Sequence, residues 1–310
     1  MTNNIKFLCS APEISQHGNW GIIEQQMINN LKSTEKIFLC CFCEMHFRTW
    51  EGYILKPIHV IKDNWIGIIH NPEDTEKYWP RVDLLKNPTF MKSLPYCKGL
   101  FCMSNETKNW IIKTINPSFF VAVLYHPLST KKLKEFDFKK YNKNKCIIQI
   151  GNWLRRSYSI YQIKCTIKKK IIPFDDNFRN ELNHFLKKDK IVLTSEEKES
   201  VIELQKLSDI EYNNLFCNHI VFLNLYSSTC NNVILECIKA NNPIIINRLS
   251  SVERYLGKEY PLFYNNLSEV SDILNNDELI LKGHLYLKDM NKEKFNINNM
   301  LKDINKHLTH

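Results

Sequence analysis

The residues best suited to chemistry lie in the segment 221–257, where a polar turn separates an apolar run from a helical pattern. The run 221–225 has the length of a strand, and the turn that follows, SSTCNN at 227–232, offers several side chains that can cap a helix. Unpaired N–H groups and the helix dipole both favour an anion at such a turn. A carboxylate one turn further along is placed to accept hydrogen bonds from a ribose. The segment therefore predicts a nucleotide-sugar site, with these donor-binding residues: Ser228, Asn231, Asn232 and Glu236.

A second polar turn, GNWLRR at 151–156, follows the apolar run 146–150. Gly151 allows a tight turn there, and the side chains of Arg155 and Arg156 can fork onto a diphosphate. The alternative is a surface turn with solvated charges. We favour donor binding by all three residues, and a catalytic role for both arginines, because the strand end, the glycine and the arginine pair coincide.

Two further motifs follow apolar runs in the first half of the chain. The sequence HGNWG at 17–21 opens a helical pattern with two glycines, so its backbone, at Gly18 in particular, could approach a phosphate or a sugar. An ordinary turn explains these glycines equally well. His70 follows the run 65–69 and could bind a sugar hydroxyl or assist proton movement, which makes it the third candidate catalytic residue. A structural histidine that caps a strand end is the alternative.

Strands and helices that alternate along both halves of the chain would position these motifs. The strands expected in the first half are 6–9, 37–42, 65–69, 99–103 and 120–124. Those expected in the second half are 146–150, 171–174, 191–193, 220–225 and 244–246. The alternation predicts an α/β protein with two Rossmann-like domains facing a central cleft. Ligands of such sheets bind outside the carboxyl ends of the strands, where every motif above is expected.

The expected domains are residues 1–128, on the acceptor side, and residues 146–290, which would bind the nucleotide sugar. The lysine-rich segment 129–145 between them is expected to be a linker, with a functional basic patch as the alternative. Residues 291–310 are expected to form an amphipathic helix that could pack back on the domain junction.

Composition narrows the class of protein. The 310 residues are 44% hydrophobic, as in globular domains, and no apolar run is long enough to span a bilayer. The N-terminal residues lack a secretory signal pattern. The 11 cysteines are scattered, which favours reduced thiols in the cytoplasm over disulfides or a metal site. The net charge of +9 favours an anionic substrate and leaves peripheral membrane contact open, but no nucleic-acid-binding module is evident.

With these residues the chain resembles the GT-B glycosyltransferases of the retaining, nucleotide-sugar-dependent kind, most clearly over residues 146–265. In that family a turn after the first strand of the second domain supplies basic side chains for the donor diphosphate, and Gly151, Arg155 and Arg156 match it. The family also carries two glutamates eight residues apart around a helix N-terminus. Glu236 matches the second glutamate, and Ser228 stands in place of the first.

The resemblance extends to the other motifs. Asn231 and Asn232 match the turn whose backbone amides hold phosphate, and His70 loosely matches a first-domain histidine at the sugar. The turn 18–21 resembles the first-domain loop of the family. The motifs HNP, CKGLF and MS within residues 65–104 also resemble a less characterised subgroup.

The resemblance implies a glycosyltransferase that moves a sugar from a nucleoside-diphosphate sugar to a glycan or another hydroxyl acceptor. It implies no bound cofactor and no obligatory metal ion. Because Ser228 replaces a glutamate, a protein that binds glycan or nucleotide without catalysis is one alternative. A nucleotide-sugar epimerase on the same fold is another, and a nucleic-acid-binding protein, suggested only by charge, is the most distant.

Overall fold

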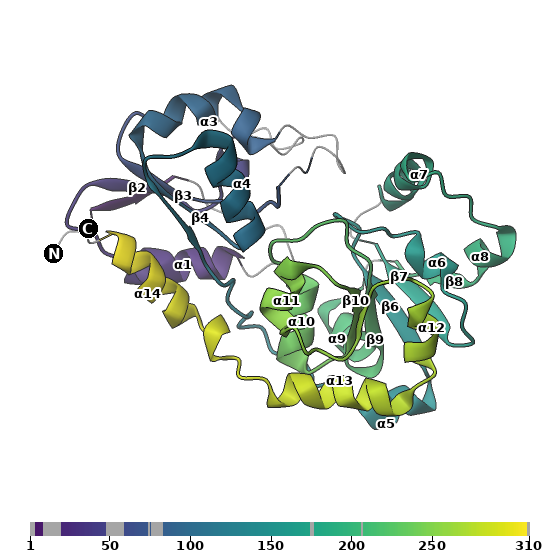
Figure 1. Cartoon of the computed structure of the whole chain (residues 1–310). Coiled ribbons are helices and arrows are strands. Elements are labelled where there is room, and N and C mark those ends of the chain that lie inside the picture. Colours follow the sequence, from purple (N-terminus) through teal and green to yellow (C-terminus); the bar gives the residue numbers. More distant parts are fainter. Residues whose placement is uncertain are drawn as a thin grey trace. The chain divides into compact units, whose positions relative to one another are not determined.

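The protein divides into two compact units. The computed structural model describes residues 4–8, 20–47, 59–73, 75, 83–173, 177–205 and 207–308. Unit 1 contains Met1–Thr130 together with Asn291–His310, and unit 2 contains Lys131–Met290 (Figure 1). No helix in the described part of the chain is both long and apolar enough to cross a membrane.

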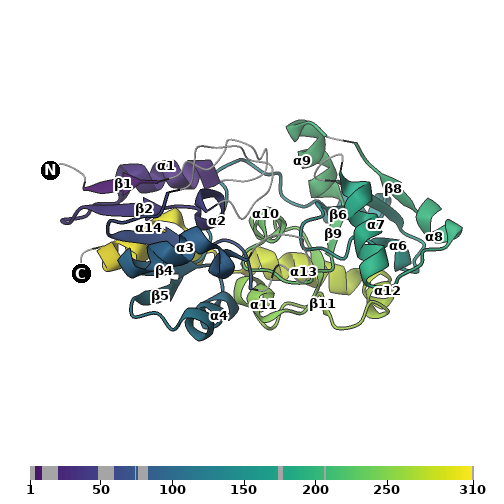
Figure 2. The ribbon, with the colours of Figure 1, turned by 90° about the horizontal axis from the view of Figure 1, so that it is seen from above.

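Unit 1 is built on a five-stranded parallel sheet whose strands follow the order of the chain. The strands are β1 Ile5–Phe7, β2 Ile37–Cys40, β3 Trp65–Ile68, β4 Cys97–Cys102 and β5 Phe120–Val123. Figure 2 shows them from β1 at one edge to β5 at the other. Every residue of β2 and β3 is buried, because a parallel sheet is covered on both faces by its crossover connections.

The helices of unit 1 include α1 Trp20–Asn30, α2 Cys43–His46, α3 Pro88–Ser93, α4 Asn105–Ile115 and α14 Ile297–Leu308. Helix α4 begins where the side chain of Ser104 accepts a hydrogen bond from the N–H of Thr107 at 3.1 Å. It ends at Asn116, which adopts a left-handed conformation with φ of 40°. The rings of Phe47, Trp65 and Phe90 pack together in the core, with centroids 5.1–6.0 Å apart.

Unit 2 carries a six-stranded parallel sheet in the order β11-β10-β9-β6-β7-β8. The strands are β6 Cys146–Ile150, β7 Lys168–Ile172, β8 Val201–Glu203, β9 Ile220–Leu223, β10 Ile244–Asn247 and β11 Phe263–Tyr264. From β6 the chain adds strands in one direction, and from β9 it adds them in the other. The neighbours β6 and β9 therefore flank the topological switch point of the sheet, where parallel α/β sheets bind ligands.

The helices of unit 2 connect these strands. They are α5 Phe138–Lys143, α6 Ser159–Gln162, α7 Phe178–Lys188, α8 Ser195–Glu199, α9 Asp209–Asn218, α10 Asn232–Ala240, α11 Ser250–Leu256, α12 Glu269–Leu274 and α13 Asp277–Asp289. The predicted α/β class with two parallel, Rossmann-like sheets is confirmed.

One predicted strand, 191–193, is wrong. Val192 is 89% exposed, and Thr194 caps α8 with a complete capping box, so the segment leads into a helix. The strand that pairs with β7 is instead β8, at the edge of the sheet. A short apolar run does not distinguish an edge strand from a segment that leads into a helix.

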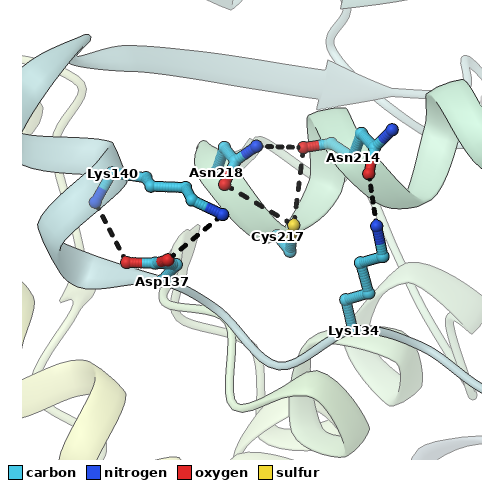
Figure 3. Close-up of polar contacts among 6 residues, drawn as sticks. All are labelled: Lys134, Asp137, Lys140, Asn214, Cys217 and Asn218. Atoms are coloured by element: carbon cyan, nitrogen blue, oxygen red, sulfur yellow. Dashed lines mark hydrogen bonds and ion pairs between the residues drawn. The ribbon is translucent and has the colours of Figure 1, made fainter.

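The basic segment 129–145 contains α5 and is bonded to α9 and α10 within unit 2. The ammonium of Lys134 donates to Oδ1 of Asn214 at 2.6 Å, and the N–H of Asp137 donates to the carbonyl of Cys217 at 2.8 Å. The N–H of Phe136 donates to the carbonyl of Ala240 at 2.9 Å. Figure 3 shows the side chains around Cys217, where Asp137 also pairs with Lys140.

Helix α14, the last described helix, packs within unit 1 and lies beside α1 (Figure 1). The ring of His307 stacks on the ring of Phe120 in β5, with centroids 4.1 Å apart. The hydroxyl of Ser33 donates to the carbonyl of Leu308 at 3.4 Å. The buried side chains of Met300, Leu301 and Ile304 complete its apolar face.

The Phe120 ring gives a first prediction. Gly99 lies opposite Phe120 in the sheet, and a Cβ atom at Gly99 would come within 2.0 Å of the ring. The ring cannot easily move, because it also contacts His307 and Phe101. We expect Gly99→Ala to lower the free energy of unfolding by about 1–3 kcal/mol, measured by urea denaturation.

Gly21→Ala is the matched control. A Cβ atom at Gly21 meets nothing within 4 Å, and alanine favours the helix α1 in which Gly21 lies. This variant is expected to keep or raise the stability of the protein. Equal losses in the two variants would contradict the packing argument.

Candidate functional site

Two loops meet at the switch point of the sheet in unit 2. We call residues 151–158, which follow β6, the arginine loop, and residues 224–231, which follow β9, the asparagine loop. The N–H of Arg156 donates to the carbonyl of Asn224 at 2.7 Å, and the N–H of Tyr226 donates to the carbonyl of Leu154 at 3.0 Å. Arg155 and Leu225 form an antiparallel bridge. The backbone thus fixes the two loops to each other.

The turn at the start of the arginine loop depends on Gly151. Its φ of 71° lies in the left-handed region, and its N–H donates to the carbonyl of Ile172 at 2.8 Å. A Cβ atom here would be in ordinary contact with the guanidinium of Arg155, 3.4 Å from its Cζ and Nη1. The positive φ, rather than crowding, is therefore what favours glycine at this turn.

Arg155 is a buried cation, with 8% of its surface exposed. Its Nη1 donates to the carbonyl of Trp153 at 2.9 Å, and its Nη2 donates to Oδ1 of Asn231 at 3.3 Å. Its Nε has no hydrogen-bond partner among the described residues. Burial lowers the pKa of Arg155 to about 10, although the nearby Tyr212 and Glu236 act in the opposite direction. A buried guanidinium with an unused N–H group suits an anionic ligand.

Asn231 joins this arginine to α10. Its Oδ1 accepts from the N–H of Val233 at 3.0 Å as the N-cap of the helix, and it also accepts from Arg155. Asn232 is the first residue of the helix and is exposed. The first N–H groups of a helix have no carbonyl partner within it, so the end of α10 next to Arg155 carries positive partial charge.

Glu236 lies further along α10 and is buried. Its Oε2 accepts a hydrogen bond from the hydroxyl of Tyr212 in α9 at 2.5 Å. Burial raises the pKa of Glu236 to about 7, while Tyr212, Lys131 and Arg155 act to lower it. No local sequence pattern indicates Tyr212, because its contact with Glu236 joins two helices, and the two residues are 24 positions apart in the chain.

Arg156 is held by the asparagine loop. Its Nη1 donates to the carbonyl of Leu225 at 2.8 Å and to Oδ1 of Asn224 at 3.2 Å. Its Cζ lies 4.3 Å from the centroid of the Tyr226 ring, in a cation–π arrangement. Ser228 is buried in the same loop. Asn224 and Tyr226 are not among the predicted site residues, although Asn224 directly follows β9 and Tyr226 stands two residues further on.

His70 lies in unit 1, at the end of β3. Its Nε2 is 2.9 Å from the carbonyl of Cys41, so this nitrogen carries the proton and donates it. The rings of Trp20 and Phe42 lie against it, with centroids 4.2 and 4.1 Å away. Burial lowers the pKa of His70 to about 3, although the bond to Cys41 acts to raise it, and nearby His126 also acts to lower it. The imidazole is therefore neutral at physiological pH.

A buried carboxylate holds the backbone at His70. Oε1 of Glu44 accepts from the N–H of His70 at 2.8 Å and from the N–H of Asn71 at 2.6 Å. Burial raises the pKa of Glu44 to about 7, although these backbone bonds act to lower it. His126, which follows β5, bonds through Nδ1 to the carbonyl of Pro127 at 2.8 Å.

The other predicted site residue, Gly18, lies outside the described residues. Within unit 2 the structure brings together Gly151, Arg155, Asn231 and, through electrostatic interaction, Glu236. Among the described residues, no group of three or more His, Cys, Asp or Glu side chains is placed to hold a metal ion.

Similarity to known proteins is found in structure rather than in sequence. No family model and no curated protein match the chain. Among solved structures, a trehalose-6-phosphate protein from E. coli bound with UDP-2-fluoro glucose is similar with a TM-score of 0.58 and 12% identity, over 94% of this chain and 76% of that one. A UDP-forming trehalose-phosphate synthase from Burkholderia xenovorans is similar with a TM-score of 0.56 and 10% identity, over 94% of this chain and 77% of that one.

Anabaena HepE in complex with UDP-glucose is similar with a TM-score of 0.57 and 11% identity, over 79% of this chain and 72% of that one. These solved structures are GT-B glycosyltransferases. At such low identity the likeness concerns the fold, and the chain shares the GT-B fold that the sequence predicts.

Glu236 gives a second prediction. Its folded pKa of about 7 exceeds the ordinary value of 4.5, so the folded state holds a proton that the unfolded state releases between these values. The stability that this proton contributes is fully present below about pH 4.5 and is lost as the pH rises to about 7. In Glu236→Gln the side chain stays neutral. As the pH rises from about 4.5 to about 7, the wild type should therefore lose stability relative to Glu236→Gln. The expected change in the difference between their unfolding free energies is on the order of 3 kcal/mol.

The measurement is urea denaturation of variant and wild type at a series of pH values. Comparing the two proteins removes the contributions of Glu44, His70 and His126, which both share. The same change at the exposed Glu199 serves as the control. A difference for Glu236→Gln that does not vary with pH would contradict the interpretation of Glu236 as a buried acid.

Proposed function

We propose that this protein is a glycosyltransferase that moves a sugar from a nucleoside-diphosphate sugar to a hydroxyl acceptor, such as a glycan. The observation that carries the proposal is the buried Arg155, bonded to the N-cap of α10 at the switch point and left with an unused N–H group. The neighbours with this fold include proteins solved with UDP-glucose or a fluorinated analogue bound, which supports a nucleotide-sugar donor.

The chemistry follows from where charge develops. When the sugar leaves its donor, negative charge grows on the β-phosphate, and preorganised cations and N–H groups lower the energy of that state. Arg155, Arg156 and the first N–H groups of α10 are the groups proposed to act on the diphosphate. The first arginine is fixed by burial and the second by Asn224, Leu225 and Tyr226, so little reorganisation is needed during the reaction.

The remaining candidates would bind the other parts of the substrates. Glu236 is proposed as the acceptor of ribose hydrogen bonds, with its carboxyl group held by Tyr212. Asn232 and Ser228 are proposed to line the phosphate and sugar end of the donor. His70 is proposed to bind a sugar hydroxyl as a neutral imidazole, whose Nδ1 is a hydrogen-bond acceptor when Nε2 carries the proton.

A binding protein without catalysis is the second candidate function. It is favoured by Ser228, which stands eight residues before Glu236 where the resemblance expects a glutamate. A serine hydroxyl cannot supply the negative charge of a carboxylate beside the transferred sugar. Tight donor binding without transfer or hydrolysis, over a broad panel of acceptors, would favour this candidate.

We also propose a cytoplasmic location. The cysteines that the structure describes form no disulfide with one another, and most of them are buried. This many cysteines without a disulfide are typical of a reducing compartment. The net charge of +9 is compatible with peripheral contact with an anionic membrane surface.

The third prediction tests the proposed function with Arg156→Gln. We expect the variant to fold and to lose about 10²–10³-fold in the rate of transfer, because it lacks one preorganised cation at the leaving group. A thermal-shift screen of the wild type against UDP-, GDP- and ADP-sugars first identifies the donor, since a bound donor raises the unfolding temperature. Transfer and donor hydrolysis are then measured with that donor.

Arg179→Gln is the control for this prediction. Arg179 lies on α7, where its exposed side chain pairs with Glu203, and the proposal gives it no role in the site. The Arg179→Gln variant is expected to transfer sugar at the wild-type rate. Wild-type transfer by Arg156→Gln, or the absence of any stabilising nucleotide sugar, would count against the proposed function.

A further inference from the structure

The C-terminal end of α7 is anchored to both loops of the site. Oδ2 of Asp189, the residue after the helix, accepts from the hydroxyl of Tyr158 in the arginine loop at 2.6 Å. The same oxygen accepts from the hydroxyl of Tyr226 in the asparagine loop. In the first turn of the helix, Glu181 accepts from the side chain of Asn152. The helix is therefore held at the carboxyl ends of β6 and β9.

This anchoring brings a second cation to the aromatic ring that supports Arg156. Nζ of Lys188, the last residue of α7, lies 5.2 Å from the centroid of the Tyr226 ring. Cζ of Arg156 lies 4.3 Å from the same centroid. The ring of Phe185, one turn earlier in α7, packs against Tyr226 with centroids 5.1 Å apart. Two positive side chains thus share one ring, which is itself fixed by Asp189.

We propose that Lys188 is a further donor-binding residue, a third cation beside Arg155 and Arg156 for the phosphate groups of a nucleoside diphosphate, positioned by Asp189 and Tyr226. The inference rests on the proposed function. Two cations this close repel each other, and an anion that contacts both removes the repulsion. A phosphate oxygen is the charge-assisted acceptor that an ammonium and a guanidinium share.

A structural role for Lys188 must be separated from this one. A lysine in the last turn of a helix also complements the negative end of the helix dipole, and such a role would act on stability rather than on a ligand. Lys187 stands in the same last turn and is exposed. Both Lys188→Gln and Lys187→Gln therefore remove a positive charge from the last turn of the helix. Only Lys188→Gln also removes a cation from the Tyr226 ring.

The test is isothermal titration calorimetry with the full chain at one fixed ionic strength. The probes are UDP, GDP and ADP, followed by the nucleoside of whichever diphosphate binds the wild type most tightly. We expect Lys188→Gln to bind that diphosphate about tenfold more weakly, as for the loss of one charge-assisted contact. Its affinity for the nucleoside, which has no phosphate, should equal that of the wild type. Lys187→Gln should match the wild type with both ligands.

Tyr226→Phe tests the positioning part of the proposal. This change keeps the ring under both cations and removes the hydroxyl that binds Asp189. We expect a smaller loss of diphosphate affinity than in Lys188→Gln, again without change for the nucleoside. Thermal denaturation of each variant shows that the protein remains folded.

The outcomes separate the two proposals. If a diphosphate binds the wild type, and Lys188→Gln binds it as tightly as Lys187→Gln does, the role of Lys188 is overturned and the proposed function stands. An equal loss for diphosphate and nucleoside in Lys188→Gln also overturns it, because the effect would not depend on phosphate. If none of the three diphosphates binds the wild type, both proposals are overturned.

Discussion

The candidate site in unit 2 depends on the backbone pairing of two loops, one after β6 and one after β9. Bonds between Arg156 and Asn224 and between Tyr226 and Leu154 join segments that are about seventy residues apart in the chain. The pairing is possible because these strands are neighbours at the point where the order of the sheet reverses. It sets where both arginines lie, which ring supports Arg156, and which helix begins next to Arg155. A different strand order would separate every one of these groups.

Burial shifts the pKa values of the two buried charged groups of the site, Arg155 and Glu236, in opposite directions. It lowers the pKa of Arg155 and raises that of Glu236, so each group is driven toward its neutral form while each stabilises the charge of the other. A buried pair of this kind costs desolvation energy and adds little stability by itself. Its position at the switch point belongs to the ligand-binding role that we propose for these residues. In unit 1, Glu44 and His70 show the same pattern, since a buried acid holds the backbone of a neutral imidazole.

Much of the fold was predictable from local patterns. The runs of β3, β6 and β9 are fully buried and almost wholly apolar, and Ser104 and Asn231 have the side chains that caps require. The arginine pair was also evident, because a glycine and a strand end preceded it. Tyr212, Tyr226 and Asp189 could not be found in this way. Their hydrogen bonds span 24 to 37 residues and depend on the packing of helices against loops, which leaves no local period in the sequence.

The division of the chain has a consequence for how the protein is made. Unit 2 is one continuous stretch, whereas unit 1 takes its sheet from the start of the chain and α14 from residues 297–308. During synthesis the ribosome therefore releases everything that unit 2 needs before it releases the helix that carries His307 to Phe120. Domains generally fold as units while the chain emerges. The domain made first would then be the last to finish, and its sheet would wait, with one face incompletely covered, for the final helix.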